Sequence, residues 1–126
     1  MVDITPLVPA GRQVIQGYGD GGFRIAGEEW RGSVIVFPDS TLAWPMATIA
    51  ELDQASLAPV SGPDSGVRIL LVGCGDAIAP LDRGVRDELS RRGIALEVMD
   101  TGAACRTFNV LLAEERAVAA ALIAIG

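Results

Sequence analysis

The first part of the chain alternates short apolar runs with glycine-rich turns, a pattern typical of antiparallel β structure. After an irregular, proline-containing start at residues 1–10, residues 13–16 predict a short strand, and the glycine cluster at residues 17–22 predicts a turn. Residues 26–27, Ala-Gly, predict a tight hairpin with glycine at a positive φ. The β-branched run at residues 33–37 predicts a further strand that stops at a proline. We therefore expect this part to be β-rich and antiparallel.

The pattern is weaker between residues 41 and 66. Residues 41–44 predict a short strand, and residues 54–57 predict a short helix for which Asp53 or a preceding residue could be the N-cap. Residues 61–66 have the composition of a loop, but they are few and apolar segments resume at once. We interpret them as a loop within one domain.

From Val67 the pattern changes to long apolar runs that alternate with helical periodicity. Residues 67–72 are almost continuously apolar, as in a strand covered on both faces. A helix is predicted to start with Pro80 in its first position and to stop at Gly93. Residues 94–99 predict the next strand. Apolar residues recur along the helix at steps of four, at Leu81, Val85 and Leu89. A strand, a helix and a strand in this order predict a βαβ unit with parallel strands and a right-handed crossover.

A second helix is predicted directly after this strand, with Asp100 or Thr101 as its N-cap and an end near residues 114–116. Its apolar face consists of Ala104, Phe108, Leu111 and Leu112, whereas Arg106, Asn109 and Ala113 point elsewhere. The alanine-rich tail could continue as a helix or form a last strand. The favoured interpretation is a helical first part and a short strand at residues 122–125.

Length and composition indicate a single domain that spans residues 1–126, and the predicted strands and helices give it a mixed α/β (α+β) class. The chain has 126 residues, of which 50% are hydrophobic, enough for a substantial core. No apolar run reaches the roughly 18 to 20 residues of a membrane-spanning helix. The start lacks the basic and apolar blocks of a secretory signal. We therefore expect a cytoplasmic protein without membrane insertion.

Charge and rare residues exclude several classes of function. The net charge is −6 and the ten basic residues are scattered, so a nucleic-acid partner is not expected. The chain contains no histidine, which excludes Ser-His-Asp and Cys-His catalysis and imidazole metal sites. Cys74 and Cys105 cannot form a cysteine-based zinc site alone, and an intracellular setting would keep them reduced. We predict no catalytic residue, metal or cofactor.

The best pocket prediction lies where the two parallel strands end. Their following loops should meet at one edge of the sheet, where open α/β sheets bind ligands. The unpaired N–H groups at the start of the second helix could bind a small anion there. Alternatively, Asp100 or Thr101 caps these groups and the glycines only turn the chain. The predicted pocket residues are Gly73, Cys74, Gly75, Asp100, Thr101, Gly102, Arg106 and Asn109.

Individual residues of this pocket have competing interpretations. A dinucleotide site is disfavoured because the third glycine of the fingerprint would fall at Ile78. Cys74 could be reactive and Cys105 could hold a stabilised thiolate, but the favoured interpretation makes each a small buried hydrophobe. Arg106 and Asn109 emerge on one side of the helix. They could contact a ligand or a partner protein, or they could tie the helix to nearby loop carbonyls.

These segments together resemble a known family. The resemblance is carried by residues 99–109, by residues 70–75, and by the earlier glycine turns at residues 17–19 and 32–36. It covers about residues 15–125. The family is that of small domains of unknown function that includes mitochondrial complex I assembly factor 3 and the adipogenesis-associated domain proteins. The resemblance implies a compact three-layer fold, with a β-sheet, a smaller β layer and helices on one side.

The resemblance also implies no established enzymatic activity and a role in binding other proteins during assembly. The leading hypothesis is therefore a non-enzymatic protein-binding or assembly-factor domain, linked to respiratory complex I assembly. The alternative is a small-molecule or anion-binding protein, or a minor enzyme, that uses the pocket at the strand ends. A redox function of the two thiols is a third hypothesis.

Overall fold

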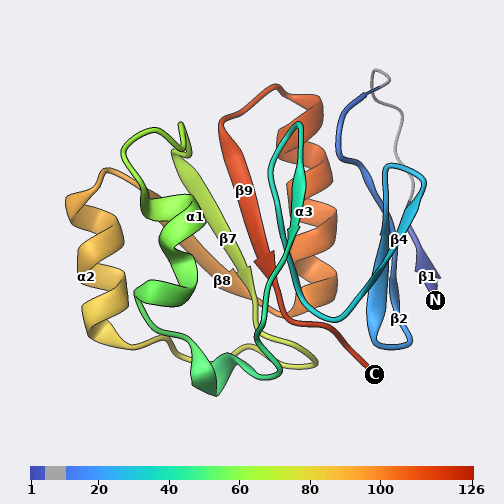
Figure 1. Ribbon diagram of the computed structural model, residues 1–126, viewed down its shortest axis with the longest axis horizontal. Helices are drawn as coiled ribbons and strands as arrows, with labels where there is room; N and C mark the ends of the chain where they lie inside the picture. The colour runs from blue at the N-terminus through green and yellow to red at the C-terminus, as the bar shows by residue number, and fades with distance from the viewer. Residues whose placement is uncertain (5–10) are drawn as a thin grey trace.

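The small sheet contains the start of the chain. The structure, a computed structural model, describes residues 1–4 and 11–126, so residues 5–10 of the predicted irregular start lie outside the described part. Four antiparallel strands lie in the order β1-β2-β3-β4, which confirms the antiparallel prediction. They are β1 (Val2–Asp3), β2 (Ile15–Gly19), β3 (Gly22–Ile25) and β4 (Glu28–Arg31). Figure 1 shows this sheet at one side of the molecule.

The predicted turn at residues 17–22 is wrong in its extent, because β2 continues through Gly19 and only Asp20 and Gly21 form the turn. The lack of a side chain at the glycine that begins β3 allows the neighbouring strand to approach closely. A Cβ on Gly22 would lie 2.1 Å from the carbonyl oxygen of Trp30 in the neighbouring strand. The hairpin at residues 26–27 is confirmed, with positive φ angles of 49° and 82°.

The large sheet has five strands in the order β6-β5-β9-β7-β8. Strand β7 is parallel to both β8 and β9, whereas β5 is antiparallel to both β6 and β9. The predicted parallel strand pair of the βαβ unit is therefore confirmed. The strands are β5 (Val34–Val36), β6 (Thr41–Ala43), β7 (Ile69–Gly73), β8 (Ala95–Met99) and β9 (Val118–Leu122).

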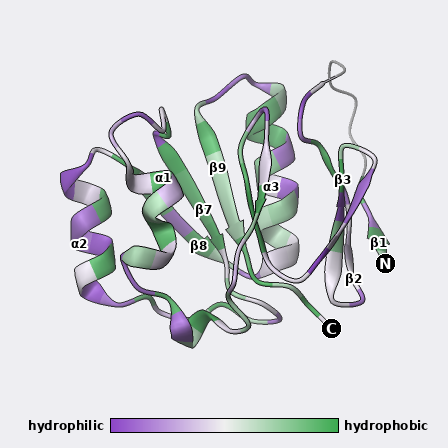
Figure 2. Ribbon diagram, viewed as in Figure 1, coloured by the Kyte–Doolittle hydropathy of each residue, from purple (hydrophilic) through white to green (hydrophobic). Residues whose placement is uncertain are grey.

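The prediction of a helical segment before residue 122 is wrong, because β9 (Val118–Leu122) is a strand throughout. All five of its residues have no exposed surface. The strand lies between β5 and β7, where small alanine side chains allow helices and sheets to pack closely on both faces. Pairing on both edges thus overrides the helical propensity of alanine. Figure 2 shows β7 and β9 as hydrophobic strands in the middle of the molecule.

The helices include three short segments and two longer ones. The predicted helix at residues 54–57 is present as a 3-10 turn that runs directly into α1. Helix α2 begins at Arg83 rather than at Pro80, because Asp82 is its N-cap and accepts hydrogen bonds from two backbone N–H groups. Gly93 follows its end at φ 75°, as predicted. The helices are η1 (Ile49–Glu51), η2 (Ala55–Leu57), α1 (Ala58–Ser61), α2 (Arg83–Arg91) and α3 (Thr101–Ala113).

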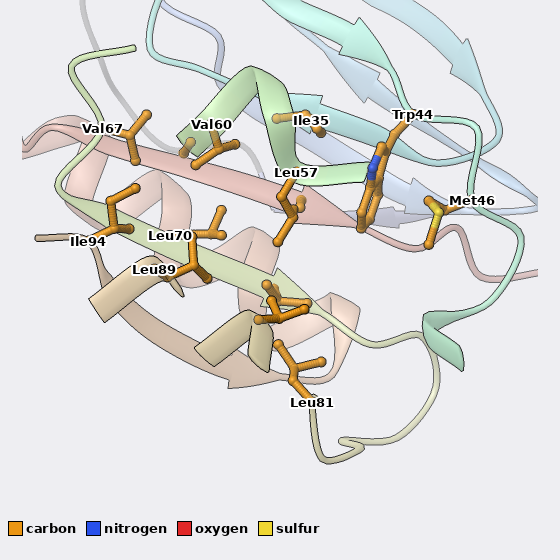
Figure 3. Packing of buried hydrophobic residues seen from close by; sticks show 14 of the residues in the cluster. Ile35, Trp44, Met46, Leu57, Val60, Val67, Leu70, Leu81, Leu89 and Ile94 are labelled. Carbon is orange, nitrogen blue, oxygen red and sulfur yellow. The ribbon is translucent and has the colours of Figure 1, made fainter. Parts of the chain in front are cut away.

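Two separate cores cover the two faces of the large sheet. Leu70 and Val72 of β7 pack with α1 and α2, whereas Leu71 packs with α3 and the small sheet. Figure 3 shows Leu70 beside Val60 of α1 and Leu89 of α2. The three-layer arrangement is therefore confirmed, but the helices lie on both faces rather than on one. The reason is topological, because the chain moves outward from β7 to β8 and then returns past β7 to β9. Successive right-handed crossovers in opposite directions place α2 and α3 on opposite faces.

Candidate functional site

The structure brings the two predicted loops together at the carboxyl ends of the parallel strands. We call residues 73–75, residues 100–102 and Ile123 the strand-end junction. Thr101, which is completely buried, is its centre. Its N–H donates to the oxygen of Gly75 at 2.9 Å, and its Oγ1 accepts from the N–H of Gly75 at 2.9 Å. The same hydroxyl donates to the oxygen of Ile123 at 2.7 Å. Three chain segments are thus held together by one side chain.

The start of α3 is capped by its own residues. Asp100 is the N-cap, and its Oδ1 accepts a hydrogen bond from the N–H of Ala103 at 2.9 Å, while its backbone oxygen accepts from Ala104 at 3.0 Å. One of the two alternatives considered from the sequence, capping by Asp100 or Thr101, is thus present through Asp100. Capping satisfies donors that an anion would otherwise use.

Tyr18 of β2 covers the side of this helix start, and it was not among the pocket residues predicted from the sequence. A Cβ on Gly102 would lie 2.6 Å from the Tyr18 hydroxyl oxygen, so any larger residue at position 102 would displace the Tyr18 side chain. The Tyr18 hydroxyl also accepts a hydrogen bond from Nη1 of Arg106 at 3.2 Å. The position of Tyr18 between two glycines was the available signal, since glycines beside an aromatic residue permit close packing.

Arg106 and Asn109 have different surroundings. Arg106 is exposed, whereas Asn109 is only 4% exposed and lies against β2. The side-chain amide of Asn109 accepts from the N–H of Ile15 and donates to its oxygen, both at 2.9 Å. Asn109 therefore ties the helix to backbone groups, although these belong to a strand and not to a loop. Both residues border a shallow groove of about 460 Å³ between α3 and Ile4.

Both thiols are buried and free. Cys74 is 7% exposed, and its Sγ donates to the oxygen of Ala79 at 3.7 Å. Cys105 has no exposed surface, and burial raises the pKa of its thiol to about 12, against a smaller opposite effect of Arg106. The stabilised thiolate considered for Cys105 is therefore wrong, and both cysteines are packed as small hydrophobes.

Among residues 1–4 and 11–126, no helix is long and apolar enough to cross a membrane. Within the same residues, no three His, Cys, Asp or Glu side chains are grouped so that they could hold a metal ion.

Proteins similar to this chain include named assembly factors and an uncharacterised bacterial protein. NADH dehydrogenase (ubiquinone) 1 alpha subcomplex assembly factor 3 of Xenopus tropicalis is 37% identical over 109 residues, which are 86% of this chain and 60% of that protein. The human protein of the same name is 35% identical over 109 residues. The chain thus spans about three fifths of the length of these assembly factors. An uncharacterised protein of Rhodobacter capsulatus is 40% identical over 114 residues and 86% of its length.

Solved structures show the same fold. The crystal structure of a protein described as an outer membrane protein from Bartonella henselae has a TM-score of 0.85 and 40% identity, covering 93% of this chain and 98% of that one. A Mth938-like domain from Bordetella pertussis has a TM-score of 0.81 and 25% identity, covering 98% and 92%. The family model described as protein of unknown function (DUF498/DUF598) matches residues 15–123. The chain therefore belongs to the DUF498/DUF598 family, which confirms the resemblance inferred from the sequence.

Proposed function

We propose that this chain is a non-enzymatic protein-binding domain of the assembly-factor type, and that its partners are components of a respiratory NADH dehydrogenase. One observation carries the proposal: relatives named as complex I assembly factor 3 are 37% and 38% identical over 86% and 87% of the chain. At this similarity the surface as well as the core can be shared. Because the chain spans only about three fifths of those proteins, the proposal concerns the activity of the shared domain.

The geometry of the strand-end junction supports a role that depends on the outer surface. Open α/β sheets usually bind ligands at the carboxyl ends of their strands. Here Gly73, Cys74, Gly75, Thr101 and Gly102 are all buried. The hydroxyl of Thr101 joins three segments at this place, and a ligand would have to break these hydrogen bonds. A partner protein can bind to the outer surface while these hydrogen bonds remain intact.

Co-purification at native expression level tests the proposal. The chain is tagged at its chromosomal locus, and proteins recovered with it are quantified against an unrelated tagged domain of similar size. We expect specific enrichment of NADH dehydrogenase components, and accumulation of incomplete NADH dehydrogenase when the gene is deleted. Recovery of no specific protein, together with normal assembly in the deletion strain, would reject the proposal. Fractionation of the same cells tests the predicted cytoplasmic location.

A second candidate function is the binding of a small organic anion beside Arg106. The observation that favours it is the exposed guanidinium of Arg106 on the first turns of α3, at the border of the shallow groove. Such a ligand would compete with the Tyr18 hydroxyl for this guanidinium. Thermal-shift screening of nucleotides and organic acids tests it. A compound that stabilises the wild type but not Arg106→Ala would favour anion binding, and the absence of such a compound would reject it.

A further inference from the structure

A depression of about 400 Å³ lies at the end of the large sheet opposite the strand-end junction. It is formed where the loop before β7 meets the end of α2 and the start of β8. Its lining includes Ser61, Pro63, Ser65, Arg68, Arg92 and Ile94. Two arginines thus border one depression in a protein whose net charge is −6. We call this feature the Arg68–Arg92 depression.

Arg92 is held in place by two contacts. Its Nη1 donates to the backbone oxygen of Ser61 at 2.9 Å, and its Nε lies 2.7 Å from Oε1 of Glu88. The other oxygen of Glu88 pairs with Arg91. The hydrogen bonds from Arg91 and Arg92 hold the pKa of the Glu88 carboxyl below its usual value. One carboxylate therefore pairs with two guanidinium groups, so Glu88 neutralises only part of the charge of Arg91 and Arg92.

Arg68 contributes a second guanidinium that is not neutralised. Among residues 1–4 and 11–126, no carboxylate or hydrogen-bond acceptor is paired with its side chain. Nη1 of Arg68 lies 3.7 Å from the position that a Cβ on Gly93 would occupy. The guanidinium is therefore directed toward the turn that follows Arg92. Asp64 is in the same loop, but it forms no ion pair with either arginine.

We propose that the Arg68–Arg92 depression binds the carboxylate of an acidic side chain on a protein partner. The proposal rests on the proposed protein-binding function and names the chemistry of one contact. Planar guanidinium groups match the two oxygens of a carboxylate. Both arginines are exposed, so a free small molecule would not be enclosed as ligand sites usually require. A carboxylate presented on a protein surface needs no enclosure, and Pro63 and Ile94 would contact its aliphatic stem.

Titration of the isotope-labelled full chain, observed by NMR, tests the site. The probes are the peptide acetyl-Gly-Glu-Glu-Gly-amide and, separately, inorganic phosphate. We expect the peptide to shift amide signals of residues 61–68 and 92–94, with an effect that decreases as salt is added. Arg68→Gln should weaken this binding about tenfold, as expected for one charge-assisted contact. Arg83→Gln is the matched control, because Arg83 is exposed and forms no ion pair in the described residues; it should leave binding unchanged.

Three results would overturn the proposal. The first is a set of shifts spread equally over arginines elsewhere on the surface. The second is equal peptide binding by the wild type and Arg68→Gln. The third is phosphate binding at lower concentration than the peptide, which would identify a small phosphate ligand as the occupant.

The co-purification experiment separates this proposal from the proposed function. Equal partner recovery with the wild type and Arg68→Gln would reject the Arg68–Arg92 depression and leave the protein-binding function intact. If the wild type recovers no partner, the proposed function fails, and the role assigned to this depression fails with it. Loss of the partner in Arg68→Gln but not in Arg83→Gln would support both.

Discussion

Asn109 joins α3 to the small sheet, and its replacement by leucine should lower the free energy of unfolding substantially. Its amide forms two hydrogen bonds with the backbone of Ile15, each 2.9 Å long, and it is 4% exposed. The N–H of Ala26, directly after β3, donates to the oxygen of Val14, directly before β2. Because antiparallel hydrogen bonds alternate along a strand, the N–H and C=O of Ile15 point away from β3 and toward Asn109.

Asn109→Leu leaves these two buried backbone groups without partners. Each unsatisfied group costs about 1–3 kcal/mol. Burial of the leucine side chain stabilises the variant by about 1–2 kcal/mol and so offsets part of this loss. We therefore expect a net loss of about 2–4 kcal/mol, which corresponds to a decrease in Tm of about 6–20 °C for a domain of this size. Urea denaturation gives the free energy, and a thermal melt followed by circular dichroism gives the Tm.

Two further variants test whether the loss of stability comes from these hydrogen bonds. Arg106→Gln changes an exposed residue of the same helix and should cost less than about 1 kcal/mol. Asn109→Asp keeps the acceptor for the N–H of Ile15 but places a carboxylate beside its oxygen, which raises the pKa of that carboxyl. The protonated carboxyl of this variant can donate to the oxygen of Ile15. Its stabilising contribution is therefore present below the pKa of the unfolded state and is lost as pH rises through the pKa of the folded state. Asn109→Asp should thus be closer to the wild type at about pH 4 than at about pH 8. Equal stability of Asn109→Leu and the wild type would refute the anchoring role.

Four other predictions concern buried residues. Thr101→Val should lower the free energy of unfolding by about 2–4 kcal/mol in urea denaturation, since both hydroxyl hydrogen bonds are lost, whereas Thr101→Ser should retain most of the stability. Cys105 should resist iodoacetamide in the folded protein and react only in denaturant, and reaction at the rate of a free thiol would contradict its burial. Burial raises the pKa of the Cys105 thiol to about 12 from 9.0. The buried neutral thiol therefore contributes its full stability below about pH 9, and this contribution is lost as pH rises toward about 12. Tm measured against pH for the wild type and for Cys105→Ala tests this. Gly22→Ala should destabilise the domain by about 2–4 kcal/mol in a thermal melt, because its Cβ would lie 2.1 Å from the oxygen of Trp30, and an unchanged Tm would show that the strands can separate there.

The confirmed elements are those predicted from residue types and spacings within a few positions of one another. The four-residue apolar spacing at Leu81, Val85 and Leu89 predicts α2, and all three residues are buried, although Leu81 lies just before the first residue of the helix. The Ala-Gly pair marks the β3–β4 hairpin because its backbone needs positive φ angles. The start of α2 was misplaced because Pro80 and Asp82 are both favourable near a helix start, and only the capping hydrogen bonds distinguish them.

The candidate site was predictable only in part. The meeting of residues 73–75 with residues 100–102 follows from the parallel pairing of β7 and β8. That Thr101 also binds the oxygen of Ile123 requires β9 beside β7, a pairing between residues about fifty positions apart. The glycines on both sides of Tyr18 indicate close packing there, but they do not identify Gly102 of α3 as its neighbour, because that contact depends on how the small sheet lies against the helix.

The sequence by itself determined the β-rich first part, the βαβ unit, the strand-to-helix step at Asp100 and the absence of histidine chemistry, because each depends on residue type or local spacing. Tertiary structure alone decided that the alanines of β9 form a central strand, that Asn109 faces β2, and that Arg68 and Arg92 border one depression. The physical reason is that these features arise from pairing and packing between distant segments, whose energies outweigh local propensities.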